Sequence, residues 1–384
     1  MENVFLKKIK IIAVCNWPLG GIRTFMQYIY SQFPADEFEI TLLANDSRER
    51  EYIEQAFIPK GIKIIWATKL FGKSLLAPSL VFQLFRQKYD IIHSQGFISA
   101  FQVALVNWLF RIPHILTIHG ILESRYFEGK AGWLKRIIFK NAMKNIAVFH
   151  GVGQGIVDHL RTEFPELKEY KAKWIVIPNG ILSDSFVHNS PEAKTELVRY
   201  CKIENNVFIF GFFGRFMAQK GFNYIIDAVN ILNNNSQPED FIVLAFGSGD
   251  FEREYKNDVI KNNLEHLIRF FPFNPNVAEL IKGCDTILMP SIWEAWGLLA
   301  SETLCSGVPL IATDCIGLKE STDDTPTIRI PSHNAAELAK AMEKAMTDNE
   351  LRGKFEKFKY QAAERYDVKN AAIKLMDIFR GLSK

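Results

Sequence analysis

Two glutamates, Glu294 and Glu302, lie eight residues apart where a predicted loop turns into a helix. The stretch around them predicts a short buried strand, a glycine turn, a helix and a second strand, at 286–289, Gly297, 298–305 and 308–313. Free backbone N–H groups at the start of this helix, with the positive end of its dipole, suit an anionic group such as a phosphate. Glu302, about one turn further in, could then accept hydrogen bonds from two sugar hydroxyls, and Glu294 would face the other side of a diphosphate.

This pair resembles the Glu-x7-Glu signature of the GT-B retaining glycosyltransferases of family 4 (group 1). The alternative is a strand and a helix whose two glutamates are merely solvated. Further motifs along most of the chain favour the resemblance, because an ordered set of motifs is more specific than any one of them. The resemblance implies an α/β fold of two Rossmann-like, doubly wound domains that face each other across a cleft.

Length and composition exclude several classes of protein. The chain has 384 residues, 48% of them hydrophobic, which is enough for two domains with separate cores. The net charge of +3 provides no basic stripe for nucleic acid, although a mildly basic protein can rest on an anionic membrane. The five cysteines show no paired spacing, so we expect reduced, buried thiols in a cytosolic protein.

Two apolar segments are too short for export or membrane insertion. The run 11–15, which follows Lys7, Lys8 and Lys10, is shorter than the core of a signal peptide and predicts a first strand. The segment 97–110 is well short of the ~20 residues that span a bilayer and predicts a core helix. We therefore expect a cytoplasmic protein, with any membrane contact peripheral and on the inner face.

Strands and helices alternate along both halves of the sequence. This alternation predicts doubly wound parallel sheets, with ligands at the carboxyl ends of the strands. Together with the resemblance, it predicts an N-terminal acceptor-binding domain, an interdomain connection, a C-terminal nucleotide-sugar-binding domain and a last helix that packs back on the first domain. Their expected bounds are 1–182, 183–205, 206–367 and 368–384.

Paired glycines, Gly20 and Gly21, stand between the first strand and its helix. Without a Cβ, the backbone there can approach a ligand closely, although an ordinary tight turn explains the pair equally well. In the family, a Gly-Gly loop at this place touches the donor diphosphate and the acceptor. Many members carry a glutamate two residues after the second glycine. This chain has Arg23, which is a candidate for binding an anionic acceptor.

Two histidines lie at the ends of neighbouring predicted strands. His119 follows the strand 115–118, and a histidine at this edge can hydrogen-bond a sugar hydroxyl. A lone histidine is more often structural, but this one resembles the family's Thr-x-His-Gly or Thr-x-His-Asp motif, whose histidine lies against the donor sugar. His93 ends the preceding strand and is a candidate for the acceptor side.

Two cations, Arg215 and Lys220, follow an apolar strand. A nucleoside diphosphate leaving group accumulates negative charge, which a metal or fixed cations must meet. The sequence has no Asp-x-Asp pair and no histidine cluster at metal spacing, so we expect no metal and assign the charge to these cations. They resemble the family's Gly-Arg-(x4)-Lys-Gly element; a solvated basic pair beside a turn is the alternative. The turn from Gly247 to Gly249 resembles the family's Gly-x-Gly, which borders the nucleotide.

One segment departs from the family pattern. Relatives usually show Phe-Leu-Gly where this chain has phenylalanine, phenylalanine, proline and phenylalanine at 270–273. A proline removes one N–H and stiffens a loop that cups the nucleobase. We place Arg269 and Phe271 among the expected donor-binding residues. The base stays open between uracil, guanine and adenine, with a UDP-sugar as the expectation.

A second glycine-rich segment, 151–155, follows a strand and opens a helix, as a dinucleotide site does. Its spacing is Gly-x-Gly-x-Gly rather than Gly-x-Gly-x-x-Gly, and the next strand ends without an acidic residue for a ribose. The sequence therefore does not favour a dehydrogenase.

The predicted helix 130–144 is amphipathic and basic. Its apolar residues and its cations lie on opposite sides, at Trp133, Ile137, Ile138 and Met143 and at Lys135, Arg136, Lys140 and Lys144. This pattern suits a helix that lies on an anionic lipid surface. An ordinary surface helix of the domain is the alternative.

Together, the motifs predict a retaining hexosyltransferase that needs neither metal nor cofactor. It would move a sugar from a nucleotide-diphosphate donor, a UDP-sugar, to a glycan or lipid-linked acceptor in cell-surface polysaccharide assembly. The resemblance implies that Glu294 and His119 contact the donor sugar and that Glu302 binds the ribose. The diphosphate would be held by Arg215, Lys220 and the amides of Gly297, Leu298 and Leu299. Two alternatives remain: a sugar-nucleotide epimerase of the same architecture, and a noncatalytic nucleotide-sugar-binding protein.

Overall fold

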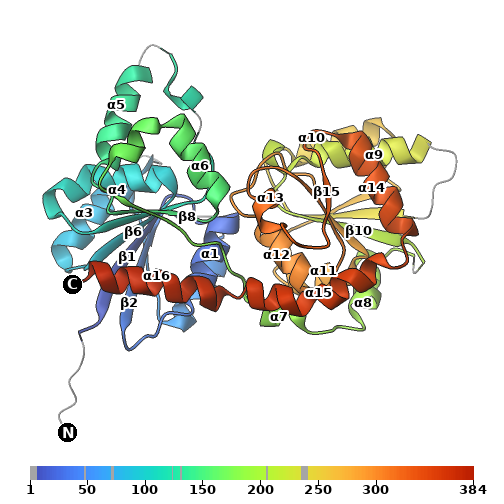
Figure 1. Cartoon of the computed structure of the whole chain (residues 1–384), viewed down its shortest axis with the longest axis horizontal. Coiled ribbons are helices and arrows are strands. Elements are labelled where there is room, and N and C mark those ends of the chain that lie inside the picture. The colour runs from blue at the N-terminus through green and yellow to red at the C-terminus, as the bar shows by residue number, and fades with distance from the viewer. Residues whose placement is uncertain are drawn as a thin grey trace, which may run out of the picture. The chain divides into compact units, whose positions relative to one another are not determined.

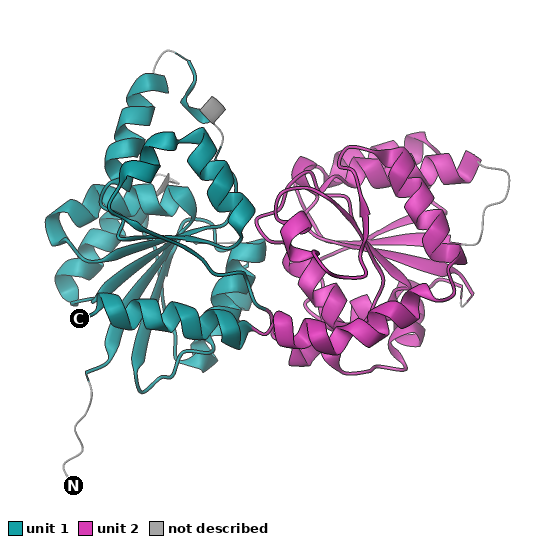
Figure 2. Cartoon of the chain, in the orientation of Figure 1, with its two compact units in different colours: residues 1–180, 368–384 teal, residues 181–367 magenta. Residues whose placement is uncertain are grey.

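The chain forms two units in a computed structural model that describes residues 7–46, 49–70, 73–122, 124–129, 132–204, 206–234 and 241–384 (Figure 1). Unit 1 comprises Met1–Gly180 and Val368–Lys384, and unit 2 comprises Ile181–Asp367 (Figure 2). Each unit has its own parallel sheet with helices on both faces, as the alternation of strands and helices predicted.

Unit 1 is built on a seven-stranded parallel sheet of order β3-β2-β1-β6-β7-β8-β9. Its strands are β1 (Ile9–Cys15), β2 (Phe38–Ala44), β3 (Lys63–Trp66), β6 (Ile91–Gln95), β7 (His114–Ile118), β8 (Val148–Gly151) and β9 (Lys173–Val176), with a separate antiparallel pair, β4 (Lys69–Leu70) and β5 (Lys73–Ser74). Its helices are α1 (Gly20–Tyr30), α2 (Arg50–Phe57), α3 (Leu76–Arg86), α4 (Gly96–Phe110), α5 (Gly132–Met143), α6 (Gln154–Glu163) and α16 (Val368–Leu382), with 3-10 turns η1 (Ile58–Lys60), η2 (Ser124–Phe127) and η3 (Pro165–Glu169). The strand order reverses beside β1, which is where ligands bind in such sheets.

The last helix of the chain, α16, packs on α1 within unit 1. Phe379 contacts the rings of Phe33 and His93, with centroids 5.6 and 5.3 Å apart. Arg380 makes two hydrogen bonds to the carboxylate of Glu37, at 2.6 and 2.8 Å. The apolar face of α16 therefore belongs to the core of the first unit, although the helix follows the whole of the second unit in sequence.

Unit 2 contains a six-stranded parallel sheet of order β12-β11-β10-β13-β14-β15. Its strands are β10 (Phe208–Phe213), β11 (Phe241–Phe246), β12 (Ile268–Phe271), β13 (Thr286–Met289), β14 (Leu310–Thr313) and β15 (Ile328–Ile330). Its helices are α7 (Asp184–Val187), α8 (Ala193–Cys201), α9 (Phe222–Asn234), α10 (Glu252–Lys261), α11 (Val277–Gly283), α12 (Leu298–Cys305), α13 (Leu318–Ser321), α14 (Ala335–Thr347) and α15 (Leu351–Arg365), with a 3-10 turn η4 (Ala218–Lys220). The order again reverses beside the first strand of the unit, β10.

The polar stretch 183–205, expected to be the interdomain connection, contains the helices α7 and α8 and lies in unit 2. Four buried residues of α8 lie on one face at helical spacing: Ala193, Leu197, Val198 and Cys201. This face packs against α11. The polar residues that suggested a linker occupy the opposite, solvated side of the helix.

The five cysteines are buried free thiols, as their spacing predicted. Within the part of the chain that the structure describes, no helix has both the length and the apolar character needed to cross a membrane.

Candidate functional site

Three loops meet at the carboxyl ends of the strands β10, β13 and β14, which are neighbours in the sheet. The loop after β10 is joined to the loop after β13 by the amide of Ile292, which donates to the carbonyl of Gln219 at 2.8 Å. The Gln219 side chain donates in return to the carbonyl of Trp293 at 3.0 Å. The amide of Glu294 donates to the carbonyl of Ile316, in the loop after β14, at 2.9 Å. These bonds fix the backbone that carries Glu294.

The carboxylate of Glu294 is buried and held by two donors. The Nζ of Lys220 and the Oγ of Ser291 both lie close to its Oε1, at 2.6 and 2.8 Å. Its side chain is only 8% exposed, whereas that of Lys220 is 25% exposed. A buried carboxylate needs such partners, because desolvation of an unpaired charge is costly. Glu294 is thus oriented before any ligand binds.

The helix α12 begins beside this carboxylate. Its N-cap, Gly297, has a φ of 82°, which favours glycine, and a Cβ there would lie 2.5 Å from Cδ2 of Leu318 and displace that side chain. Among the described residues, the amides of Gly297, Leu298 and Leu299 donate to no protein acceptor. The helix therefore presents open N–H groups and the positive end of its dipole at the place that the sequence predicted.

Glu302 lies one turn into α12 and is 8% exposed. Its carboxylate has no hydrogen-bond donor within the described part of the chain. Burial raises the pKa of this carboxyl from 4.5 to about 7. The carboxyl group of Glu302 has thus lost its hydration, and no hydrogen bond from the described residues replaces it. This is expected of a group that accepts hydrogen bonds from a ligand.

The two predicted cations, Arg215 and Lys220, differ in whether they pair with other groups of the protein. Lys220 is committed to Glu294, as described above. Arg215 is exposed, and its guanidinium makes no hydrogen bond or ion pair with the described residues. Arg215 therefore offers an unneutralised charge, whereas Lys220 first serves to hold a carboxylate.

The glycines of the loop after β11 allow a close approach between two protein loops. A Cβ on Gly247 would lie 1.8 Å from the carbonyl oxygen of Gly214, and one on Gly249 would lie 2.4 Å from that of Phe216. The amide of Phe216 donates to the carbonyl of Ser248 at 3.0 Å. These glycines therefore position the loop that carries Arg215, whatever they contact in a ligand.

Phe271 belongs to a stack of three phenylalanines at the ends of β10, β11 and β12. The ring centroids of Phe213 and Phe246 are 5.1 Å apart, and those of Phe246 and Phe271 are 5.0 Å apart. Arg269, earlier in β12, donates to the carbonyls of Cys201 and Lys202 at 3.4 and 3.1 Å. It thereby stabilises the C-terminal end of α8. This engagement does not suit the expected contact with the donor.

In unit 1, Gly20 and Gly21 form the first turn of α1 rather than a loop before it. Gly20 has a φ of 55°, and no atom lies within 4 Å of a Cβ built on Gly21. Their amides donate to no acceptor in the described residues. Unit 1 therefore also presents an open helix N-terminus, next to its topological switch point.

Arg23, three residues into α1, is engaged within unit 1. It is 6% exposed, its guanidinium is hydrogen-bonded to the carboxylate of Glu49, and it lies over the ring of Tyr52 with 4.5 Å to the centroid. A cation that is buried and neutralised in this way does not suit the expected contact with an anionic acceptor. The partner, Glu49, could not be inferred from local sequence, because it comes from a different part of the unit.

His93 is also buried, which corrects its assignment to the acceptor side. It is 0% exposed, its Nδ1 is hydrogen-bonded to the hydroxyl of Tyr30 at 2.8 Å, and its Nε2 to Oγ1 of Thr117 at 2.6 Å. Both ring nitrogens are therefore used inside the unit. As a residue of the central strand β6, it faces the layer formed by α1 and α16 rather than solvent.

The same hydrogen bonds continue to His150, and their direction can be deduced. The Nε2 of His150 must donate to the carbonyl oxygen of Ile177, at 3.1 Å, because that oxygen can only accept. Burial lowers the pKa of His150 to about 4, so the ring is neutral and its Nδ1 accepts from Thr117, at 2.9 Å. Thr117 then accepts from Nε2 of His93, and the Nδ1 of His93 accepts from Tyr30.

At the other end of this series of hydrogen bonds lies His119, which the sequence predicted as a site residue. The hydroxyl of Tyr30 accepts from Nε2 of Gln95 at 3.1 Å, and the Oε1 of Gln95 accepts from Nε2 of His119 at 2.7 Å. Burial, with the nearby His150, lowers the pKa of His119 to about 3. The half-buried ring is therefore neutral with its proton on Nε2, and its Nδ1 is an acceptor without a partner in the described residues.

Sequence analysis missed the residues that complete these two regions. Gln95, Tyr30 and Thr117 relay the hydrogen bonds of His119, and Ser291 and Gln219 hold the loop of Glu294. Gln95 ends β6 and Ser291 follows β13, so position at a carboxyl strand end was the available signal. Among the described residues, no group of three or more His, Cys, Asp or Glu is arranged to hold a metal ion.

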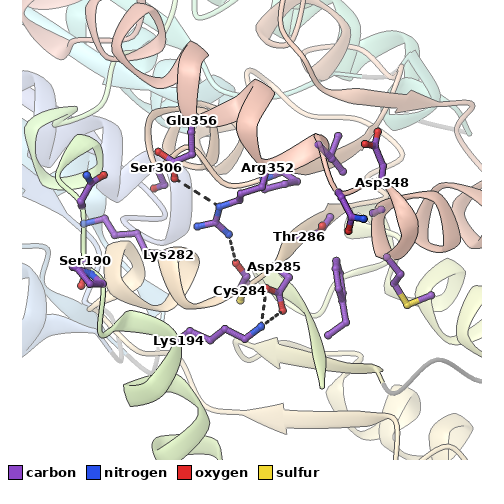
Figure 3. A pocket seen from close by; sticks show the side chains of 18 of the residues that line it. Ser190, Lys194, Lys282, Cys284, Asp285, Thr286, Ser306, Asp348, Arg352 and Glu356 are labelled. Carbon is purple, nitrogen blue, oxygen red and sulfur yellow. Dashed lines mark hydrogen bonds and ion pairs between the residues drawn. The ribbon is translucent and has the colours of Figure 1, made fainter. Parts of the chain in front are cut away.

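A cavity of about 750 Å³ in unit 2 lies away from this chemistry (Figure 3). It is lined by the residues that precede β13 and by parts of α8, α11 and α15, so it lies at the amino-terminal edge of the sheet. Its cations are engaged by protein groups: Lys194 bonds to Asp285 at 2.7 Å, and Arg352 donates to the carbonyl of Cys284 at 3.0 Å (Figure 3). The cavity therefore presents no free charge to a ligand.

Two family models together match most of the chain. The model of Glycosyltransferase Family 4 matches residues 19–185, and that of Glycosyl transferases group 1 matches residues 194–362. The chain therefore belongs to the group 1, family 4 glycosyltransferases of GT-B fold, and it acts on sugar-nucleotide donors.

Individual relatives agree with this assignment. A UDP-Gal:alpha-D-GlcNAc-diphosphoundecaprenol alpha-1,3-galactosyltransferase of Escherichia coli is 26% identical over 328 residues, which cover 81% of this chain and 80% of the relative. A D-inositol 3-phosphate glycosyltransferase of Corynebacterium urealyticum is 23% identical, over 77% of this chain and 72% of its own. Among solved structures, Anabaena HepE in complex with UDP-glucose superposes with a TM-score of 0.82 at 19% identity, covering 97% of this chain and all of its own.

Proposed function

We propose that the protein transfers a hexosyl group from a UDP-sugar to a hydroxyl of a glycan or lipid-linked acceptor, with retention of configuration at the anomeric carbon and without a metal ion. One observation carries this proposal: the open amides of Gly297, Leu298 and Leu299 lie in the chain between two buried carboxylates, Glu294 and Glu302. An anion site flanked by two hydroxyl acceptors is suited to a diphosphate with a sugar on each side.

Each described group would have a defined task. The α12 amides and Arg215 would hold the diphosphate, and Glu302 would accept hydrogen bonds from the ribose hydroxyls. Glu294, pre-oriented by Lys220 and Ser291, would accept hydrogen bonds from the donor sugar and stabilise oxocarbenium character. His119 would accept a further hydroxyl at its Nδ1.

In the reaction, the bond between the anomeric carbon and the phosphate oxygen breaks, and a bond from that carbon to the acceptor oxygen forms. The acceptor would attack from the side that the diphosphate leaves, which preserves the configuration. The departing phosphate oxygen would take the acceptor's proton, so no protein base is required. Arg215 and the α12 amides would stabilise the charge that develops on the diphosphate.

The relatives support the choice of donor and acceptor. The E. coli relative is named for UDP-galactose and a diphosphoundecaprenol-linked sugar, and the HepE structure contains UDP-glucose. Other relatives are named for D-inositol 3-phosphate, a small phosphorylated molecule. A saccharide on a lipid diphosphate carrier, as used in cell-surface polysaccharide assembly, is the acceptor we propose.

Product analysis tests this proposal. The protein is incubated with a series of UDP-, GDP- and ADP-sugars, with and without a lipid-diphosphate saccharide and with EDTA throughout, and the products are followed by NMR of the anomeric protons. We expect transfer from a UDP-sugar with the anomeric configuration retained, and transfer about 10²–10³ times slower by Glu294→Gln. Inversion, or a requirement for a divalent ion, would contradict the proposed mechanism, and an epimerised donor without acceptor would identify an epimerase.

A further inference from the structure

The helix α4 exposes large apolar residues on the side that carries polar residues in an ordinary surface helix. Its buried face carries Val103 and Val106, which belong to the core, together with small or polar residues such as Ser99 and Asn107. Its exposed face carries large apolar residues at helical spacing: Ile98, Leu105, Trp108 and Leu109. A surface helix normally carries polar residues on its exposed side, because its large apolar side chains stabilise the core. The solvent-facing stripe of α4 therefore serves something other than packing within unit 1.

The neighbouring helices α3 and α5 continue this apolar surface. Both pack against α4, and all three lie near one another in Figure 1. Phe82 and Phe85 project from α3, and Phe85 is 76% exposed. On α5, Trp133 is 67% exposed, and three more apolar residues are exposed beside it: Leu134, Ile137 and Ile138. We call this surface of α3, α4 and α5 the three-helix face.

The structure also corrects the pattern predicted for the helix 130–144, of which residues 130 and 131 lie outside the described residues. Two of its cations, Arg136 and Lys140, pair with Glu166 at 3.3 and 3.1 Å. Met143 is buried. Lys135 is exposed on α5, Lys144 directly follows the helix, and neither is paired within the described residues. The apolar residues that an ordinary surface helix would bury are those that α5 exposes.

The three-helix face is positively charged at its edges and carries no negative charge of its own. The sequences of α3, α4 and α5 contain no aspartate or glutamate. Exposed cations without ion pairs among the described residues lie at its borders: Arg86, Lys88, Arg111, Lys135 and Lys144. A protein partner would meet this surface with carboxylates at particular points. A bilayer with anionic headgroups meets it everywhere, with an apolar interior behind.

We propose that the three-helix face docks the protein onto an anionic lipid bilayer. Trp108, Trp133 and Phe85 would insert among the headgroups, where aromatic residues are favoured, and the bordering lysines and arginines would contact lipid phosphates. Exposed apolar patches of this extent on a soluble domain mark interaction sites. The proposal does not depend on the transfer reaction, because docking needs neither donor nor acceptor.

Vesicle sedimentation with the full chain tests this proposal. Binding is measured to phosphatidylcholine vesicles and to vesicles that also contain phosphatidylglycerol. Leu105→Glu is compared with Ile373→Glu on α16, a matched control because the two residues are 52% and 53% exposed on helices of the same unit. We expect binding to the anionic vesicles, about tenfold or more weaker with Leu105→Glu and unchanged with Ile373→Glu, because a carboxylate at the apolar surface opposes insertion.

Three further measurements complete the test. Lys135→Glu combined with Lys144→Glu should weaken binding to anionic vesicles and make the remaining binding less sensitive to salt. Circular dichroism checks that each variant is folded, and Trp108→Ser replaces Leu105→Glu if that variant is not. Tryptophan emission should shift to the blue on binding, and less so with Trp108→Ser.

Equal binding of Leu105→Glu and Ile373→Glu, or no binding of the wild type to anionic vesicles, would overturn the proposal. A wild-type dimer in analytical ultracentrifugation that Leu105→Glu abolishes, without vesicle binding, would assign the three-helix face to a second copy of this chain instead.

Discussion

The carboxyl ends of the two sheets carry different chemistry. In unit 2, buried carboxylates, a lysine and open helix amides surround the start of α12. In unit 1, a chain of neutral groups leads from His119 to the carbonyl of Ile177, and each member donates to the next. One Rossmann-like scaffold therefore supports either a charged or a neutral site, and the residues at its strand ends decide which.

The two regions also respond to pH in opposite senses. The folded pKa of His119 is lowered below its usual 6.5, so its contribution to stability is complete above pH 6.5 and is lost as pH falls towards about 3. The folded pKa of Glu302 is raised above its usual 4.5, so its contribution is complete below pH 4.5 and is lost as pH rises through about 7. Without a ligand, each region therefore favours the neutral form of its group.

The largest expected effect separates the two carboxylates of unit 2. Glu294→Gln should lower kcat by about 10²–10³ with little change in UDP affinity, because its task lies at the reacting sugar. Glu302→Gln should weaken UDP binding about tenfold and change kcat less. Steady-state kinetics and calorimetry measure both. Equal loss of nucleotide affinity in the two variants would contradict this division of roles.

A second pair of variants tests which cation of unit 2 is available to a ligand and which one is paired within the protein. Arg215→Ala should weaken UDP binding by about tenfold without destabilising the fold, because its guanidinium is exposed and unpaired in the described residues. Lys220→Ala should lower the free energy of unfolding by about 2–4 kcal/mol, because it leaves Glu294 buried without its cation. Chemical denaturation and calorimetry distinguish them. A stable Lys220→Ala protein would show that the ion pair is not needed to hold Glu294.

The direction of the hydrogen bonds in unit 1 predicts which ring nitrogen of His119 carries the proton. In the wild type, ¹⁵N NMR should show His119 neutral and protonated at Nε2 from pH 5 to 8. Gln95→Leu removes the acceptor of that proton, so it should mix the tautomers and lower kcat about tenfold while UDP affinity stays the same. Ser94→Ala, which removes the hydrogen bonds to His114 at 2.8 Å and to the carbonyl of Ile115 at 3.3 Å and none of those in the series from His119, serves as the control from the same strand. A wild-type His119 protonated at Nδ1 would contradict the deduced direction of these hydrogen bonds.

A smaller effect concerns the stability of the ligand-free protein. Because burial raises the pKa of Glu302, ionising it above pH 7 costs folding free energy, up to about 3 kcal/mol. Glu302→Gln should therefore be more stable than the wild type at pH 8 and equally stable at pH 4. Denaturant unfolding at both values measures this, and a variant less stable at pH 8 would mean that Glu302 has a partner in the folded protein.

Local sequence signals predicted most of the region around α12. The strand at Thr286–Met289 and the helix at Leu298–Cys305 occur where the apolar runs and glycines indicated. Gly297 could be recognised because the left-handed turn it adopts is a local property. The partnership of Glu294 with Lys220 could not, because 74 residues separate the two in sequence.

The errors in unit 1 have the same origin. His93 was assigned to the acceptor side because it ends a strand, but Tyr30 and Thr117 bury both of its nitrogens. Arg23 was taken as a free cation because Glu49 is distant in sequence. The exposed apolar stripe of α4 was missed because a helix that is apolar on most of its sides has no clear periodicity to show which side faces solvent.

We propose that Glu302 is left without a hydrogen-bond donor among the described residues so that it can bind the ribose of the nucleotide. Titration calorimetry of UDP near pH 6, in buffers of different ionisation enthalpy, tests it most directly. Ribose hydroxyls should favour the carboxylate, so binding should release a proton and affinity should rise up to about pH 7. The terminal phosphate of UDP also titrates in this range, so Glu302→Gln provides the baseline. We predict more proton release by the wild type than by Glu302→Gln; equal release would contradict the assignment of Glu302 to the nucleotide.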